Sequence, residues 1–164
     1  MTTSEKAKTI IKYYEGCRLR PYRCPASLWT VGYGHVLYPD QKKLKLDSRN
    51  KYELRPQDNR EWTQAEVDQL FLRDISIVES GVARLCPAAA YRQGFMDALV
   101  SFAFNLGLGA LQRSTLRMKL NRGEIAKAAN EFLKWNKVNG VVLAGLLKRR
   151  MVERQLLLST PKEG

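Results

Sequence analysis

The sequence is poor in cysteine and histidine. It contains Cys17, Cys24 and Cys86 and one histidine, His35, among 164 residues. An odd cysteine count in a chain of this length does not indicate a disulfide framework, and synthesis in a reducing compartment is the simpler interpretation. Because no CxxC pair occurs and the single histidine has no partner at metal-ligand spacing, we expect neither a metal site nor another cofactor.

Long apolar runs are also missing. The N-terminal segment MTTSEKAKTIIKYYEG is too polar for a signal peptide or a membrane anchor, so we expect no export instruction in the chain itself. No internal repeat, low-complexity tract or linker divides the sequence. A chain of 164 residues, 45% of them hydrophobic, suits one compact domain or two small lobes.

Acidic residues are the third shortage. The 16 Asp and Glu residues are outnumbered by 28 Lys and Arg residues, which gives a formal net charge of +12. Such a charge favours polyanionic partners, among which nucleic acid, an anionic membrane and an anionic cell wall all qualify. The sequence lacks zinc-finger spacing, an RNA-binding signature and a basic region followed by heptads, so we expect no nucleic-acid partner.

The patterning predicts an α+β fold. A helix over 4–15, capped by Ser4 or Thr3, is followed from Cys17 to about Leu46 by prolines, glycines and β-type residues typical of a small antiparallel sheet. Residues 40–61 are very polar and predict an irregular loop or a long hairpin. Thr63 to Glu66 match a capping box, and a long amphipathic helix follows to about residue 82.

The remaining sequence predicts mostly helices. The expected elements are an apolar helix with Tyr91, Phe95, Leu99, Phe102 and Leu106 on one side, ended by Gly107 and Gly109, two shorter helices near 114–121 and 123–135, and a last helix that starts after Gly140 and runs through Leu158. We therefore expect a sheet lobe over about 17–60, a connecting helix over about 63–82, and a helical lobe over about 87–160 that includes the N-terminal helix. A cleft between two lobes could hold a long polymer.

The segment Glu15–His35, EGCRLRPYRCPASLWTVGYGH, carries the candidate chemistry. A glycosidase needs a carboxylic acid that stays protonated near neutral pH, and partial burial favours the protonated form. Glu15 meets this requirement because it ends an apolar helix face. A hairpin that begins a few residues later could place a second group on the opposite side of a sugar ring.

This segment resembles the T4-type phage lysozymes, which are glycoside hydrolases of the phage endolysin group. Their pattern is a Glu, eight residues, an Asp, five residues and a Thr, followed by Gly-x-Gly-His. Glu15, Cys24, Thr30 and Gly32–His35 fall on that spacing, with Cys24 at the usual Asp position. Further matches are Trp62–Asp74, Phe104–Gly107, and Trp135 through Glu153, so the resemblance covers nearly the whole chain.

The resemblance implies a lysozyme-like fold and a set of site residues. Glu15 would be the general acid, and Thr30 would hydrogen-bond the attacking water. His35 would have a structural role by pairing with Asp74. Phe104, Thr115 and Asn130 lie where the family lines its saccharide cleft, and each has an alternative interpretation as a core or capping residue.

Cys24 needs a separate argument because a cysteine supplies negative charge only as thiolate. Nearby Arg18, Arg20 and Arg23 could favour that form. The thiolate could orient or deprotonate the water, stabilise the oxocarbenium-like transition state, or attack the anomeric carbon; we favour the first two roles. Alternatively, Cys24 is a small core residue. A disulfide between Cys17 and Cys24 could silence the site if geometry allows.

The resemblance implies cleavage of the β-1,4 bond between N-acetylmuramic acid and N-acetylglucosamine in bacterial peptidoglycan, with inversion at the anomeric carbon. It also implies synthesis in a host cytoplasm and passage to the wall through a separate membrane-permeabilising factor. Two rivals remain: a wall-binding module without catalysis, and a cationic membrane-active protein. The second is suggested by VVLAGLLKRRMVERQLLL, whose apolar and basic mixture is seen in helices on anionic membrane surfaces. Nothing in the sequence indicates more than a monomer.

Overall fold

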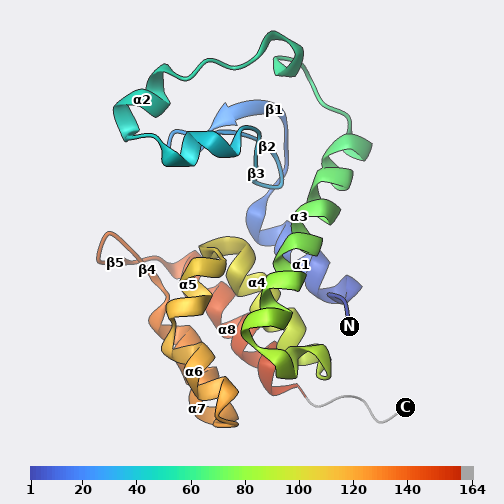
Figure 1. The fold of residues 1–164 in the computed structure, drawn as a ribbon, viewed down its shortest axis with the longest axis vertical. Helices are drawn as coiled ribbons and strands as arrows, with labels where there is room; N and C mark the ends of the chain where they lie inside the picture. Colours follow the sequence, from blue (N-terminus) through green and yellow to red (C-terminus); the bar gives the residue numbers. More distant parts are fainter. Residues whose placement is uncertain (160–164) are drawn as a thin grey trace. The chain divides into compact units, whose positions relative to one another are not determined.

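The computed structural model of the protein describes residues 1–159. The chain forms two compact units, which we call the sheet unit (Glu15–Asp74) and the helical unit (Met1–Tyr14 with the chain from Ile75 onward). The division falls inside two helices, α1 (Glu5–Glu15) and α3 (Gln64–Leu85). The predicted α+β class is confirmed (Figure 1).

The sheet unit contains the predicted antiparallel sheet. Its strands are β1 (Arg18–Arg23), β2 (Trp29–Gly32) and β3 (His35–Val36), in the order β1-β2-β3. The ladder between β1 and β2 is irregular between Arg18 and Tyr22, so β1 carries a bulge. The apolar side chains buried in this unit are Leu28, Val31, Tyr38, Val67 and Phe71.

The segment after the sheet is helical in short pieces. It forms η1 (Pro39–Lys43), α2 (Leu46–Lys51) and η2 (Pro56–Asp58), so of the two expected alternatives, an irregular loop or a long hairpin, the hairpin is wrong. Pro39 and Pro56 each open a 3-10 turn, where the missing proline N–H breaks no hydrogen bond.

Two arginines hold this segment in place. The guanidinium of Arg23 donates to the carbonyl oxygens of Arg49 at 2.6 Å, Asn50 at 3.1 Å and Tyr52 at 2.8 Å. Arg49 in turn donates to the carbonyls of Gln41, Leu44, Lys42 and Ala26. Part of the positive charge of the chain is therefore used in hydrogen bonds to backbone carbonyls of the sheet unit.

The long helix α3 begins with the predicted capping box. The Thr63 hydroxyl accepts from the Glu66 backbone N–H at 3.2 Å, and Glu66 Oε1 accepts from the Thr63 N–H at 3.0 Å. Arg60 donates to both carboxylate oxygens of Glu66, at 3.0 and 2.6 Å. The hydrogen bonds from Arg60 and Thr63 lower the pKa of Glu66 to about 2.

The helical unit is built around one buried helix. Its elements, besides parts of α1 and α3, are η3 (Pro87–Ala90), α4 (Gln93–Leu106), α5 (Leu108–Arg113), α6 (Thr115–Asn121), α7 (Ile125–Glu131), η4 (Phe132–Lys134), β4 (Lys137–Val138), β5 (Val141–Val142) and α8 (Ala144–Leu158). Every residue from Phe95 to Ala103 in α4 is buried, and α4 packs against α5 and α8. This helix forms the centre of the core.

Three details differ from the sequence-based prediction. Tyr91 precedes α4 and is 83% exposed, so it is not part of the apolar helix face. Gly107 ends α4 as expected, but Gly109 lies within α5. The last helix starts after Gly140, as expected, but only at Ala144, because Asn139 (φ 50°) and Gly140 (φ 79°) form the turn of the β4–β5 hairpin and Val141–Val142 form β5.

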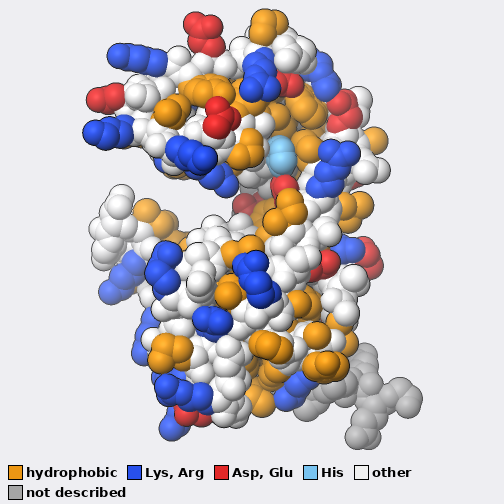
Figure 2. All heavy atoms as spheres, in the orientation of Figure 1, with side chains coloured by type: hydrophobic (Ala, Val, Ile, Leu, Met, Phe, Trp, Pro, Cys, Tyr) orange, Lys and Arg blue, Asp and Glu red, His pale blue; other side chains and the backbone are white. Residues whose placement is uncertain are grey.

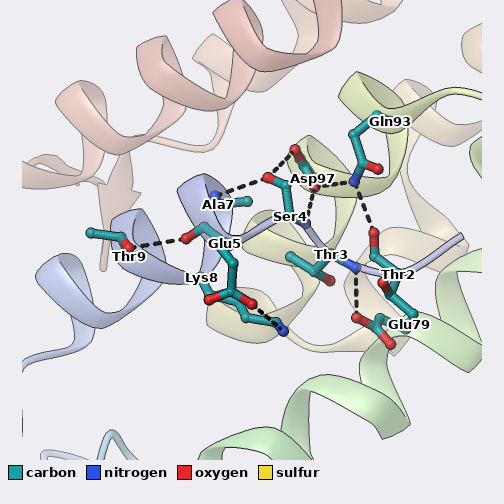
Figure 3. Close-up of polar contacts among 10 residues, drawn as sticks. All are labelled: Thr2, Thr3, Ser4, Glu5, Ala7, Lys8, Thr9, Glu79, Gln93 and Asp97. Carbon is teal, nitrogen blue, oxygen red and sulfur yellow. Dashed lines mark hydrogen bonds and ion pairs between the residues drawn. The ribbon is translucent and has the colours of Figure 1, made fainter.

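The beginning of α1 is fixed to other helices of its unit (Figure 3). Ser4 caps the helix by accepting from the Ala7 N–H at 3.1 Å. Asp97 of α4 accepts from the Ser4 N–H and hydroxyl at 2.9 and 2.7 Å, and Glu79 accepts from the Thr3 N–H at 2.7 Å. The helix that ends at Glu15 therefore starts from a well-anchored residue.

Helix α8 does not present the basic face that its sequence suggests. Arg149 and Arg150 are buried, at 3% and 0% exposure, and both pair with the buried carboxylate of Glu153. Ser101 of α4 donates to Glu153 Oε2 at 2.5 Å. Burial raises the pKa of Glu153, and the two arginines oppose that shift. These charges belong to the core, so Arg149 and Arg150 are not available for the membrane-surface contact that the apolar and basic sequence of α8 suggests.

Many of the remaining basic side chains lie on the face of the molecule drawn in Figure 2. Figure 2 shows Lys and Arg side chains scattered over the visible face of each unit rather than gathered in one patch. Within residues 1–159, no helix has both the length and the apolar character needed to cross a lipid bilayer.

Candidate active site

Glu15 lies where α1 meets the sheet. It is the last residue of α1, and Gly16, at φ +68°, takes the left-handed conformation that ends the helix. A Cβ atom placed on Gly34 would lie 3.3 Å from Glu15 Oε2. The turn between β2 and β3 therefore approaches the Glu15 carboxyl so closely that a side chain at position 34 would crowd it.

Cys24 and Thr30 belong to the same hairpin. The ladder pairs Tyr22 with Thr30 and Arg23 with Trp29, and the Cys24 N–H donates to the Leu28 carbonyl at 3.0 Å as the next step. Side chains alternate between the two faces of a strand, and directly paired residues share a face. Tyr22, Cys24 and Thr30 therefore project from one face of the sheet.

The two polar groups predicted for the water site differ in burial. Thr30 is 2% exposed, and its hydroxyl donates to the Leu28 carbonyl at 2.8 Å, so only its oxygen lone pairs remain for another donor. Cys24 is half-buried and has a free thiol. The core-residue interpretation of Cys24 is thus not supported by its burial.

The arginines expected to favour a thiolate are partly engaged elsewhere. The Arg23 guanidinium donates to four carbonyls and lies 4.4 Å from the centre of the Trp29 ring. Arg18 lies 4.3 Å from the centre of the Tyr22 ring. Arg20 is exposed on β1. Arg18 and Arg23 therefore act first as structural side chains of the sheet.

Tyr22 is the residue of this site that sequence reasoning missed. It is half-buried, and burial raises the pKa of its phenol while the charge of Arg18 opposes that shift. The negative charges of Cys24, Glu15 and Cys17 raise the Tyr22 pKa further. The two-residue spacing of Tyr22 and Cys24 in a strand was a usable sequence signal, because it places both on one face.

The structure does not support a disulfide between Cys17 and Cys24. Both thiols are free, and the two residues flank opposite ends of β1. Arg18, at one end of β1, pairs with Gly32, and Arg23, at the other end, pairs with Trp29. Gly32 and Trp29 are three residues apart along β2, which corresponds to roughly 10 Å. A disulfide needs Cα atoms within about 7 Å, so the sheet would have to open.

His35 pairs with Asp74, as expected, and its structural role stays a prediction. Its Nδ1 lies 2.8 Å from Asp74 Oδ2, and this pair connects β3 to α3. Gly32 approaches the same helix, because a Cβ atom there would lie 2.8 Å from Val67 Cβ. Gly32 is therefore a packing requirement between strand and helix.

The three candidate saccharide residues lie in the helical unit on separate helices. Phe104 is half-buried in α4, and Thr115 is the exposed first residue of α6. Asn130 is exposed on α7, where its Oδ1 accepts from Arg154 Nε at 3.1 Å. Their role in binding remains a prediction.

The residues of the sheet unit can support acid-assisted displacement. A carboxyl group at the end of α1 can give a proton to a leaving group, and a thiol with a hydroxyl acceptor can hold a water molecule. Within the described residues, no cluster of three or more His, Cys, Asp and Glu side chains could hold a metal ion.

Comparison with known proteins gives a consistent result. The family model "Phage lysozyme" matches residues 12–153. An endolysin of Bacillus phage B103 is 40% identical over 97% of this chain and 55% of its own length. An endolysin of Acyrthosiphon pisum secondary endosymbiont phage 1 is 37% identical, covering 97% of this chain and 99% of the relative. The chain thus spans about half the length of the first of these relatives and nearly all of the second.

A solved structure shares the fold. The muramidase domain of SpmX from Asticaccaulis excentricus superposes with a TM-score of 0.76 at 28% identity, covering 97% of this chain and 99% of that domain. The expected lysozyme-like fold is confirmed.

Proposed function

The chain belongs to the phage lysozyme family, a family of peptidoglycan-hydrolysing glycosidases, and we propose that it is an endolysin acting as a muramidase. It cleaves the β-1,4 bond between N-acetylmuramic acid and N-acetylglucosamine in bacterial peptidoglycan. The observation that carries this proposal is the sheet unit itself, in which Glu15 ends a helix against Gly34 while Cys24 and Thr30 share one sheet face. The reaction requires no metal or other cofactor.

The reaction follows from these three side chains. Glu15 donates its proton to the glycosidic oxygen as the bond from that oxygen to the anomeric carbon breaks. A water molecule donates one hydrogen bond to the Thr30 oxygen and another to the Cys24 thiolate. The water oxygen then bonds to the anomeric carbon and its proton passes to Cys24. Solvent afterwards reprotonates Glu15 and deprotonates Cys24.

This mechanism inverts the anomeric carbon, because water attacks from the face opposite the leaving group. Direct attack by the Cys24 sulfur would instead form a thioglycosyl intermediate and give retention. Proton NMR of the first-formed product anomer distinguishes the two routes.

The test of the proposed function is release of reducing ends from purified peptidoglycan. We expect wild-type protein to generate new reducing ends and soluble glycan fragments. If the protein binds the insoluble wall but releases nothing, it serves as a wall-binding module and the proposal is wrong.

Phe104, Thr115 and Asn130 are proposed to bind the glycan, and alanine variants should raise KM more than they lower kcat.

Replacing Gly34 by alanine should lower kcat about tenfold or more. The new Cβ lies 3.3 Å from Glu15 Oε2 and pushes the proton donor out of place, at a backbone with φ +72° that costs about 1 kcal/mol for a residue other than glycine. Gly123→Ala is the matched control, because Gly123 has φ +78° and no atom within 4 Å of an added Cβ. Equal losses of activity in both variants, measured at equal fractions folded, would contradict a role for Gly34 at the carboxyl.

The cellular route of the protein and its oligomeric state are further parts of the proposal. We propose synthesis in the host cytoplasm and passage to the wall through a separate membrane-permeabilising factor, with the protein acting as a monomer and without a nucleic-acid partner. Its net charge of +12 supports attraction to the anionic wall.

Contact with an anionic membrane is a second candidate property, and one observation favours it. The β4–β5 hairpin exposes Val138, Val141, Val142 and Leu143 by 49%, 61%, 52% and 42%. Exposed aliphatic side chains beside the exposed Lys137 suit an anionic lipid surface. The hairpin, rather than the buried arginines of α8, is therefore the proposed contact.

Vesicle binding tests this contact. The double variant Val141→Ser, Val142→Ser should bind vesicles of phosphatidylglycerol and phosphatidylethanolamine about tenfold more weakly in co-sedimentation. Ile77→Ser is the control, since Ile77 is 66% exposed on α3 outside the hairpin. Unchanged binding of the double variant would exclude the hairpin as a membrane contact.

A further inference from the structure

We propose that Tyr33 is a positioning residue whose hydroxyl fixes the β2–β3 turn to helix α3 and thereby holds Gly34 against the carboxyl of Glu15. The inference deepens the proposed function and rests on it, because Glu15 is the proton donor of that reaction. Its structural basis is a set of contacts within the sheet unit that join the turn to α3 on one side and to the chain beside Glu15 on the other.

The turn between β2 and β3 presents backbone, not a side chain, to the proton donor. Only Tyr33 and Gly34 separate Gly32, the last residue of β2, from His35, the first residue of β3. A Cβ atom on Gly34 would lie 3.3 Å from Glu15 Oε2. A small shift of this turn therefore changes the space in which the carboxyl is held, and misplacement of a catalytic group by about 1 Å can cost a hundredfold in rate.

The Tyr33 hydroxyl is bonded to the first turn of α3. Gln64 Nε2 donates to the Tyr33 hydroxyl oxygen at 3.1 Å and to Asp68 Oδ1 at 3.0 Å. An amide nitrogen carries two hydrogens, so these two bonds use both of them. Because Tyr33 accepts from Gln64, its own hydrogen is left for another acceptor.

That acceptor is the side chain of Cys17, two residues after Glu15. Burial raises the pKa of the Tyr33 phenol, the hydrogen bond from Gln64 lowers it, and the hydrogen bond to the Cys17 side chain raises it, as expected when the phenol donates. The hydroxyl therefore keeps its hydrogen near neutral pH and connects α3 with the chain beside Glu15. A serine at position 17 could accept the same bond.

The ring of Tyr33 is supported separately from its hydroxyl. It packs on Phe71 of α3, with the ring centroids 5.2 Å apart, and Phe71 is 1% exposed. Tyr33→Phe keeps this packing and removes only the hydroxyl, so the variant is expected to fold. The substitution therefore isolates the hydrogen bonds that join the turn to Gln64 and Cys17.

Two substrates with different leaving groups test the proposal. The leaving sugar of peptidoglycan needs a proton from Glu15, whereas a 2,4-dinitrophenyl glycoside of the peptidoglycan disaccharide releases a stable phenolate without one. With soluble peptidoglycan fragments, we expect Tyr33→Phe to lower kcat about fivefold with little change in KM. With the dinitrophenyl substrate, kcat should stay within about twofold of wild type, because proton donation is not required.

Two further variants locate the effect. Gln64→Ala should lower kcat on peptidoglycan fragments in the same direction, and the double variant Tyr33→Phe, Gln64→Ala should be no slower than Tyr33→Phe, because both changes break one contact. Tyr52→Phe is the matched control. It removes a hydroxyl that donates to Asp40 at 2.9 Å elsewhere in the sheet unit, and it should leave both rates unchanged.

Amide hydrogen exchange measures the turn without catalysis. In Tyr33→Phe, the backbone amides of residues 33–35 should exchange about fivefold faster than in wild type, because the loss of the hydroxyl lowers the cost of local opening. In Tyr52→Phe, the same amides should exchange at the wild-type rate.

The outcomes are distinct. Equal losses of kcat on the two substrates, no loss on peptidoglycan fragments, or unchanged exchange of the turn in Tyr33→Phe would each overturn the proposal. If the wild-type protein releases neither reducing ends nor dinitrophenolate, the muramidase proposal fails instead. The exchange measurement then still decides whether the Tyr33 hydroxyl holds the turn.

Discussion

Glu15→Gln should reduce the release of reducing ends from purified peptidoglycan by about a thousandfold. Glutamine keeps the shape of the side chain but has no acidic proton for the glycosidic oxygen, so the leaving sugar would depart as an unstabilised alkoxide. The carboxyl stands at the end of α1, where Gly34 leaves room for it. Binding to the insoluble wall should remain, because the substitution removes only the proton donor.

A matched control exists on the same helix. Glu5 stands in the first turn of α1, 90% exposed, in a surface pair with Lys8 at 3.1 Å. Glu5→Gln should leave both the rate and the melting temperature nearly unchanged, since exposed pairs contribute little to stability. If Glu15→Gln released reducing ends at the wild-type rate, Glu15 would not be the proton donor. Bacterial lysis by that variant without sugar release would instead support the membrane-active alternative.

Cys24 substitutions should have the second largest effect on kcat, and they should separate the possible roles of the thiol. Cys24→Ser should lower kcat about a hundredfold or more, because a hydroxyl does not ionise near neutral pH and cannot accept the proton of the attacking water. Cys24→Asp places a carboxylate at this position and should retain activity within about tenfold of wild type. Iodoacetamide should inactivate the wild-type protein and leave Cys24→Asp active.

The cysteines outside the site provide controls for this series. Cys17→Ser should retain activity, since Cys17 is exposed before β1. Cys86 is buried, and burial raises the pKa of its thiol to about 11. Full activity in Cys24→Ser would mean that Cys24 contributes only to packing. The attacking water would then be held by Thr30 alone. Retention of configuration in wild type, together with an inactive Cys24→Asp, would point to direct attack by sulfur.

The catalytic segment shows how much local sequence determines. Apolar spacing over Ala7 to Tyr14 predicts a helix, and the following glycine places Glu15 at its end; both are found. The β-type residues around Thr30 predict a strand, and period-two alternation sets which side chains share a face. The capping box at Thr63 is equally local. These features depend on residues a few positions apart, so the chain itself specifies them.

The β4–β5 hairpin was predictable in principle. The Asn139–Gly140 pair is a strong turn signal because both residues adopt positive φ. Interpreting Val141 to Leu143 as the start of a helix gave too much weight to their apolar character. Here the error lay in the choice between two local patterns.

Only the tertiary structure decided which partners the charged side chains contact. Arg23 contacts carbonyls 26 to 29 residues away, and the buried pairs of Glu153 include Ser101, 52 residues away. Sequence alone counts these arginines toward a basic surface. Folding instead places Arg149 and Arg150 in the core, where both pair with Glu153 of the same helix, because a buried charge is stable only when it is paired. The distance between Cys17 and Cys24 and the crowding of Glu15 by Gly34 likewise depend on how the sheet folds. The bond from the Thr30 hydroxyl to the Leu28 carbonyl, in contrast, joins residues only two positions apart. The sequence by itself determined which groups carry the chemistry, and the tertiary structure decided which of their hydrogens and charges are available for it.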